Sequence, residues 1–98
     1  MNNVKILLVK SDRTREYGFI GYDLNIKINN KINLENYIAA YSFEMESSEL
    51  NLEKIYEMFQ NCSCNVPSDY QNRSLSVGDI IQVDEVMYYV DSFGFKAI

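Results

Sequence analysis

The first third of the chain contains two stretches whose apolar pattern is typical of strands. Residues 4–10 are rich in leucine and β-branched side chains and end at a polar turn, so they are predicted as a strand. Residues 17–28 are predicted as a second strand, because Leu24, Ile26 and Ile28 alternate with polar neighbours. Each strand is expected to turn one face towards a core.

The middle of the chain combines a third strand with one clear helix. Apolar side chains at every second position from Tyr37 to Met45 indicate a strand with one core face. An amphipathic helix is predicted over about residues 51–61, with Asn51 as its N-cap and Leu50 in a hydrophobic staple with Ile55. Its apolar stripe consists of Leu52, Ile55, Tyr56 and Phe59.

The last third returns to strands separated by turns. Residues 80–83 and 86–90 are predicted as strands on either side of an acidic turn, and residues 95–98 as a short last strand. The order of strands, one helix and strands predicts the α+β class, with a mostly antiparallel sheet and one main helix packed on one face. The length of 98 residues suits a single domain over residues 1–98.

The same pattern predicts several core and turn positions. Tyr37 and Tyr41 share the core side of their strand, and Tyr56 lies on the helix stripe, so all three are expected in the core. Gly78 and Gly94 stand at turns where a positive φ favours glycine. The other expected core residues are Leu75, Val77, Ile80, Val83, Val90, Phe93 and Phe95.

Charge narrows the class of partner. The net charge is −5, but residues 1–31 hold six basic and three acidic side chains, a net +3, whereas residues 32–98 hold three basic and eleven acidic ones, a net −8. An acidic protein is a poor ligand for nucleic-acid phosphate, so no direct DNA binding is expected. It suits a larger protein with a basic surface. The alternative is that the acidic residues only confer solubility.

The residue inventory argues against an enzyme. The chain lacks histidine and any glycine-rich phosphate loop. A disulfide between Cys62 and Cys64 would be strained, and a zinc site needs about four ligands, so both are interpreted as reduced thiols. No metal site or cofactor is predicted, because four candidate aspartates do not match a calcium loop: Asp23, Asp79, Asp84 and Asp91. Asp79 and Asp91 are expected to serve turns.

An acidic face around the predicted helix is the main candidate for partner binding. Glu49, Glu53 and Glu57 recur every four residues, which is the spacing of one helix face. Glu44 and Glu46 extend this acidic zone from the preceding strand. Secondary candidates in loops and turns are Tyr70, Arg73, Asp84 and Glu85. The alternative is a solvated face without a partner.

The expected location is the cytoplasm, with the protein a monomer or a homodimer. No apolar stretch approaches the roughly 18 residues that a membrane helix needs. The apolar run at residues 6–9 is too short for a signal peptide.

Two C-terminal segments carry a family resemblance. Residues 73–79, RSLSVGD, and residues 88–95, YYVDSFGF, follow a helical motif at residues 52–59. With them, residues 37–98 resemble the YodL-like domain, whereas residues 1–36 carry no part of it. Much of this motif is expected to specify the fold.

The resemblance implies a setting on plasmids, conjugative elements and phages of Firmicutes, where such domains accompany anti-defence functions. Small acidic proteins of that setting resemble anti-CRISPR inhibitors. We therefore expect binding to a type II CRISPR effector nuclease, which blocks guide-RNA loading or DNA binding in its basic channel. Two alternatives stay open: a structural or regulatory accessory module of a plasmid or conjugative element, and a nuclease that uses carboxylates.

Overall fold

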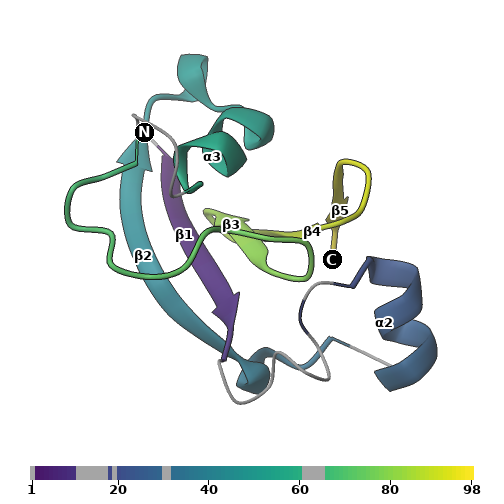
Figure 1. Ribbon diagram of the computed structural model, residues 1–98. Coiled ribbons are helices and arrows are strands. Elements are labelled where there is room, and N and C mark those ends of the chain that lie inside the picture. The colour runs from purple at the N-terminus through teal and green to yellow at the C-terminus, as the bar shows by residue number, and fades with distance from the viewer. Residues whose placement is uncertain (1, 11–17, 19, 30–31, 61–65) are drawn as a thin grey trace.

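A single sheet of five strands organises the computed structural model, which describes residues 2–10, 18, 20–29, 32–60 and 66–98 (Figure 1). The strand order is β2-β1-β3-β4-β5, and every neighbouring pair is antiparallel. The strands are β1 (Asn2–Val9), β2 (Tyr37–Met45), β3 (Ile80–Val83), β4 (Val86–Val90) and β5 (Phe95–Ala97). With its helices, this sheet confirms the predicted α+β class.

Strand β1 lies inside the sheet, between β2 and the C-terminal strand β3. It pairs with β2 along its whole length and with β3 from Val4↔Val83 to Leu7↔Ile80. Its side chains alternate between two core clusters: Val4 and Ile6 pack in one, and Leu7 and Val9 in the other. Both faces of the sheet therefore bury apolar surface, because alternate residues of a strand point to opposite faces.

Helix α3 (Leu52–Met58) covers one face of the sheet, as predicted. Asn51 caps it, since its Oδ1 accepts hydrogen bonds from the backbone N–H of Glu53 at 2.9 Å and of Lys54 at 3.2 Å. The α-helix is shorter than the predicted residues 51–61, because Phe59 leaves helical geometry as its C-cap. The carbonyl of Phe59 instead accepts the N–H of Leu75 at 3.1 Å, which ties the helix end to the following loop.

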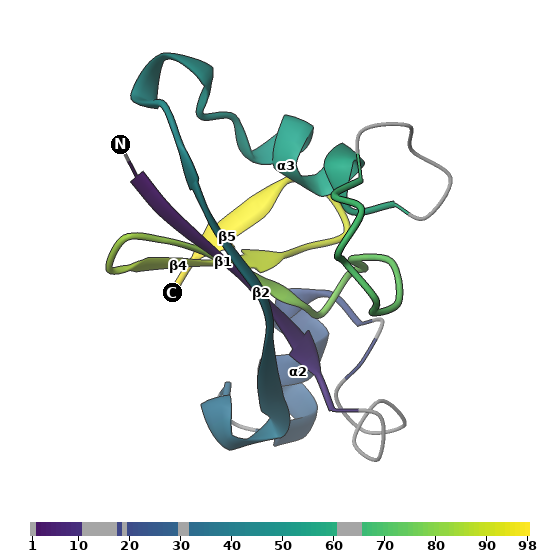
Figure 2. The same cartoon turned by 90° about the vertical axis from the view of Figure 1, so that its left-hand side faces the viewer.

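The predicted strand over residues 17–28 is wrong: Tyr22–Asn29 form a second helix, α2. Figure 2 shows α2 and α3 on opposite sides of the strands. The alternation of Leu24, Ile26 and Ile28 with polar neighbours was misleading, because Leu24 and Ile28 are exposed. The buried residue is Asn25, whose Nδ2 donates to the hydroxyl of Tyr89 at 3.0 Å. This tertiary hydrogen bond holds α2 with a polar side chain, rather than an apolar one, towards the protein.

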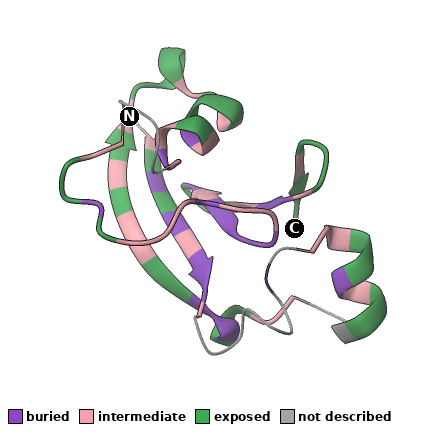
Figure 3. Cartoon of the chain, in the orientation of Figure 1, coloured by how far each residue is buried: buried purple, intermediate pink, exposed green. Residues whose placement is uncertain are grey.

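Most of the predicted core is confirmed, with two exceptions (Figure 3). Tyr37 and Tyr41 were expected on the same side of their strand, but Tyr37 packs in the cluster opposite α3 and Tyr41 packs against the cluster under α3, because the pairing of β1 with β2 shifts between Ile6 and Leu7. Phe93, expected in the core, is 95 % exposed at the tip of the β4–β5 turn. Gly94 beside it has φ 73°, and Gly78 has φ 99°, as their turn positions predicted. The buried members of the predicted set are Leu75, Ile80, Val83, Val90 and Tyr37, while Tyr41, Tyr56, Val77 and Phe95 are half-buried.

Candidate functional site

The glutamates of the predicted acidic face lie on different elements of the structure. Glu53 and Glu57 lie one turn apart on α3 and are both exposed. Glu49 belongs instead to a separate 3₁₀ turn, Ser47–Glu49, so the prediction of one helix face carrying all three is wrong. The helix starts only after Asn51, because the capping side chain marks the first turn there.

Glu44 is separated further. Its strand neighbours Phe43 and Met45 pack against the core under α3, so Glu44 points to the opposite face of β2. Glu46 follows the strand and caps the 3₁₀ turn through its backbone, without a side-chain hydrogen bond. Of the predicted acidic face, Glu53 and Glu57 remain together as a pair of exposed carboxylates on the α3 side.

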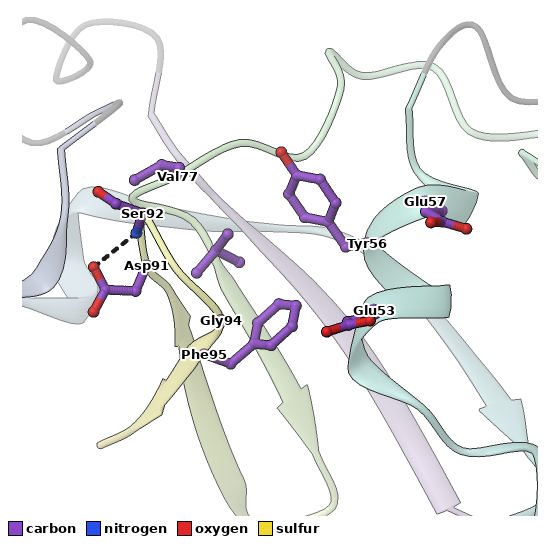
Figure 4. A pocket seen from close by; sticks show the side chains of 9 residues that line it. Glu53, Tyr56, Glu57, Val77, Asp91, Ser92, Gly94 and Phe95 are labelled. Atoms are coloured by element: carbon purple, nitrogen blue, oxygen red, sulfur yellow. Dashed lines mark hydrogen bonds between the residues drawn. The ribbon is translucent and has the colours of Figure 1, made fainter.

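This pair forms one rim of a groove of about 280 Å³ between α3 and the β4–β5 turn. Figure 4 shows Tyr56 reaching from the helix into the groove, with Phe95 across from it and Glu53 pointing towards Phe95. The two rings meet edge to face, with 6.5 Å between their centroids and an interplanar angle of 67°. Val77 and Val90 add apolar surface to the lining. The groove thus combines aromatic walls with carboxylates.

Asp91 lies at the same groove, but its carboxylate serves the fold. Its Oδ1 accepts the N–H of Ser92 at 2.8 Å and the N–H of Tyr22 at 3.1 Å. The carboxylate points away from Tyr56 in Figure 4. Since Tyr22 is the first residue of α2, Asp91 caps that helix from the β4–β5 turn, where negative charge is favourable. The predicted turn role of Asp91 is confirmed.

Arg73, a secondary candidate for partner binding, is engaged inside the protein. Its guanidinium donates to both carboxylate oxygens of Asp79, at 2.7 and 2.8 Å, and Asp79 is only 1 % exposed. Asp79 also accepts the N–H of Ser76 at 2.8 Å and of Val9 at 3.0 Å. The hydrogen bond to Asp79 is the main reason why the pKa of Arg73 is raised. This network, the Arg73–Asp79 clasp, holds the loop before β3 against the end of β1.

Tyr70 lies in a loop as predicted, but it is buried rather than exposed, with an exposed fraction of 9 %. Its ring packs against Phe59 at a centroid distance of 4.9 Å, and its hydroxyl donates to the carbonyl of Arg73 at 2.6 Å. Burial raises the pKa of Tyr70 to about 12. Tyr70 is therefore a core residue. The composition of the surrounding loop did not indicate that it is buried.

The other turn candidates are exposed at the predicted β3–β4 turn. Asp84 has φ 53°, and its Oδ1 accepts the N–H of Asn3 at 2.9 Å, while Glu85 extends to solvent. Within the described ranges, no group of three or more candidate ligands is placed to hold a metal ion. Cys62 and Cys64 lie outside the described residues. No described helix has the length and apolar character needed to cross a membrane.

A second hollow, which was not predicted from the sequence, lies beside Phe93. It measures about 360 Å³ and is lined by Phe93, Leu24, Asp23 and Ser92, among others. The sequence Asp-Ser-Phe-Gly could have predicted the exposure of Phe93, because the residue before a turn glycine with positive φ lies at the tip of the turn.

Taken together, the fold and groove define a small antiparallel α+β domain with a local acidic, aromatic hollow on its α3 side. The family model of the YodL-like domain matches residues 3–98, so the chain belongs to that family. Searches for similar curated proteins and for similar solved structures found no match.

The family match corrects the extent of the resemblance, which was expected over residues 37–98 only. It also includes β1 and α2. The physical reason is plain in the sheet, because β1 is the partner of both β2 and β3. Within the motif at residues 73–79, the first and last residues form the Arg73–Asp79 clasp, so this part of the motif specifies the fold.

Proposed function

We propose that the protein acts by binding a basic surface of a larger protein, without catalysis. The observation that carries this proposal is the exposed pair Glu53 and Glu57 beside the aromatic groove. No salt bridge within the described part of the chain involves either residue, whereas the carboxylate of Asp79 is paired with Arg73. Carboxylates that lack an internal counter-charge attract a complementary positive surface and increase the rate of encounter.

The proposed target class is a type II CRISPR effector nuclease in the cytoplasm of a bacterial cell. This choice rests on the mobile-element setting that the family resemblance implies. Such an effector holds its guide and target in a positively charged channel. A small acidic domain docked in that channel would block guide-RNA loading or DNA binding. Because the acidic residues are divided between faces, the proposal involves one local contact rather than imitation of a DNA surface.

A pull-down with guide-free and guide-loaded effector, combined with a DNA-cleavage assay, tests this function. The double variant Glu53→Lys with Glu57→Lys should lose binding and inhibition, and added salt should weaken the wild-type complex. Glu44→Lys is the matched control, because it reverses an exposed charge on the other face of the sheet. Its binding should stay close to wild type.

Absence of binding to both effector forms, with undiminished cleavage, would overturn the CRISPR proposal. Co-purification with a relaxase or helicase of a conjugative element would then favour an accessory binding module. Magnesium-dependent turnover of nucleic acid by the protein alone would contradict a non-catalytic role.

A further inference from the structure

We infer that the groove between α3 and the β4–β5 turn receives a single arginine side chain of the protein partner. This inference rests on the proposed function and names the chemistry of its central contact. The groove has about 280 Å³, near the lower limit of roughly 300 Å³ for small-molecule pockets. It suits one long side chain better than a nucleotide or a packed helix.

The aromatic walls favour a planar cation. Tyr56 and Phe95 both line the groove and contact each other edge to face, with 6.5 Å between their centroids. A guanidinium stacks on an aromatic face through cation–π attraction and is more weakly hydrated than an ammonium. Val77, which is half-buried, provides apolar surface against which the methylene stem of arginine can pack.

The carboxylates are placed to complete the recognition. Glu53 points towards Phe95, and Glu57 lies one helical turn further along the same rim (Figure 4). A guanidinium can donate parallel hydrogen bonds to a carboxylate while its plane rests on a ring, which an ammonium cannot do. The combination of a hollow, two rings and a carboxylate aimed at one of them is what selects arginine.

Lys96, which follows the groove residue Phe95 on β5, is engaged on another face. Lys96 on β5 places its Nζ over the ring of Tyr22, 5.6 Å from the centroid, towards α2. Tyr22 belongs to the core cluster on the face opposite α3. Lys96 therefore lies away from the groove, and no salt bridge among the described residues involves Glu53 or Glu57.

The test is a nuclear magnetic resonance titration of the isotope-labelled full chain with three capped tripeptides, Gly-Arg-Gly, Gly-Lys-Gly and Gly-citrulline-Gly. The arginine peptide should shift the amide signals of Tyr56, Ser92 and Phe95 in a saturable way. The lysine peptide should bind more weakly, and the citrulline peptide, which has the same shape without charge, should leave these signals in place.

Variants then separate the two parts of the site. Glu53→Gln should raise the Kd of the arginine peptide about threefold, as expected for an exposed ion pair. Tyr56→Leu should raise it about threefold through loss of the cation–π contact, with a dispersed spectrum as the check on folding. The matched control Glu44→Gln should leave the Kd unchanged, because Glu44 lies on the other face of the sheet.

Equal shifts with citrulline, no saturable shift with arginine, or an equal effect of Glu44→Gln would overturn the arginine site. If the effector binds but the peptide does not, the acidic-surface function stands and the groove assignment fails. If the peptide binds in the groove but no effector does, the arginine site stands and the CRISPR target fails.

Discussion

Replacing Asp79 with alanine removes the centre of the Arg73–Asp79 clasp. The carboxylate accepts two hydrogen bonds from Arg73 and one each from the backbone N–H groups of Val9 and Ser76. An alanine at this position accepts none of them. The variant therefore leaves the backbone N–H groups of Val9 and Ser76 without this acceptor at the junction of β1, the loop before β3 and β3.

The expected loss can be worked out from these contacts. Breaking a buried ion pair by removing one partner costs about 3–5 kcal/mol. The Arg73 side chain is 31 % exposed and can regain water, which points to the lower end of that range. That range is the total cost of removing the carboxylate, so it already includes about 1 kcal/mol for each backbone donor left unsatisfied. We expect a loss of about 3 kcal/mol from a total of roughly 5–15 kcal/mol.

Urea unfolding followed by circular dichroism and tyrosine fluorescence measures this loss, since the chain has eight tyrosines and no tryptophan. The midpoint of thermal unfolding should fall by about 12–24 °C for a domain of this size. Glu85→Gln, which removes an exposed carboxylate, is the control and should change stability by less than about 0.5 kcal/mol. A loss below about 1 kcal/mol for Asp79→Ala would refute the assignment of Asp79 as a structural anchor.

Three further measurements test other parts of the structure. Gly21→Ala should cost about 1 kcal/mol, because an added Cβ would lie 2.9 Å from Asp91 Oδ1, which accepts the N–H groups of Tyr22 and Ser92; an unchanged midpoint of thermal unfolding would contradict this close approach. Phe93→Ser should change stability by less than about 0.5 kcal/mol, because the ring is 95 % exposed, and a larger loss would show that the ring is packed. In an alkaline titration, the contribution of Tyr70 to the free energy of unfolding should be fully present below pH 10 and lost towards pH 12. The phenol of Tyr70 ionises near 10 when unfolded but near 12 when folded, and Tyr70→Phe should reduce this pH dependence.

Local periodicity was sufficient for the elements whose burial follows their own pattern. Helix α3 was predictable because its apolar stripe and its Asn51 cap lie within a few residues of each other. Strands β3 and β4 were predictable for the same reason, together with the turn at Asp84 and Glu85. In these segments the spacing of apolar residues indicated the element type, although β1 supplies part of their packing.

Helix α2 depended on distant contacts. Its alternating apolar residues suit a strand, yet Asn25 bonds to Tyr89 and Asp91 caps its first turn, and both partners come from the C-terminal third. The prediction of one acidic face was wrong for a related reason. Glutamates four residues apart lie on one side only where the backbone is a continuous helix. The 3₁₀ turn before Asn51 breaks that continuity.

The groove likewise required two segments that are about 40 residues apart in the chain, Tyr56 on α3 and Phe95 on β5. Spacing along a sequence reports backbone geometry over one or two turns. The meeting of side chains from separate elements is set by the order of strands in the sheet, and that order brings β1 beside β3 and places the β4–β5 turn next to α3.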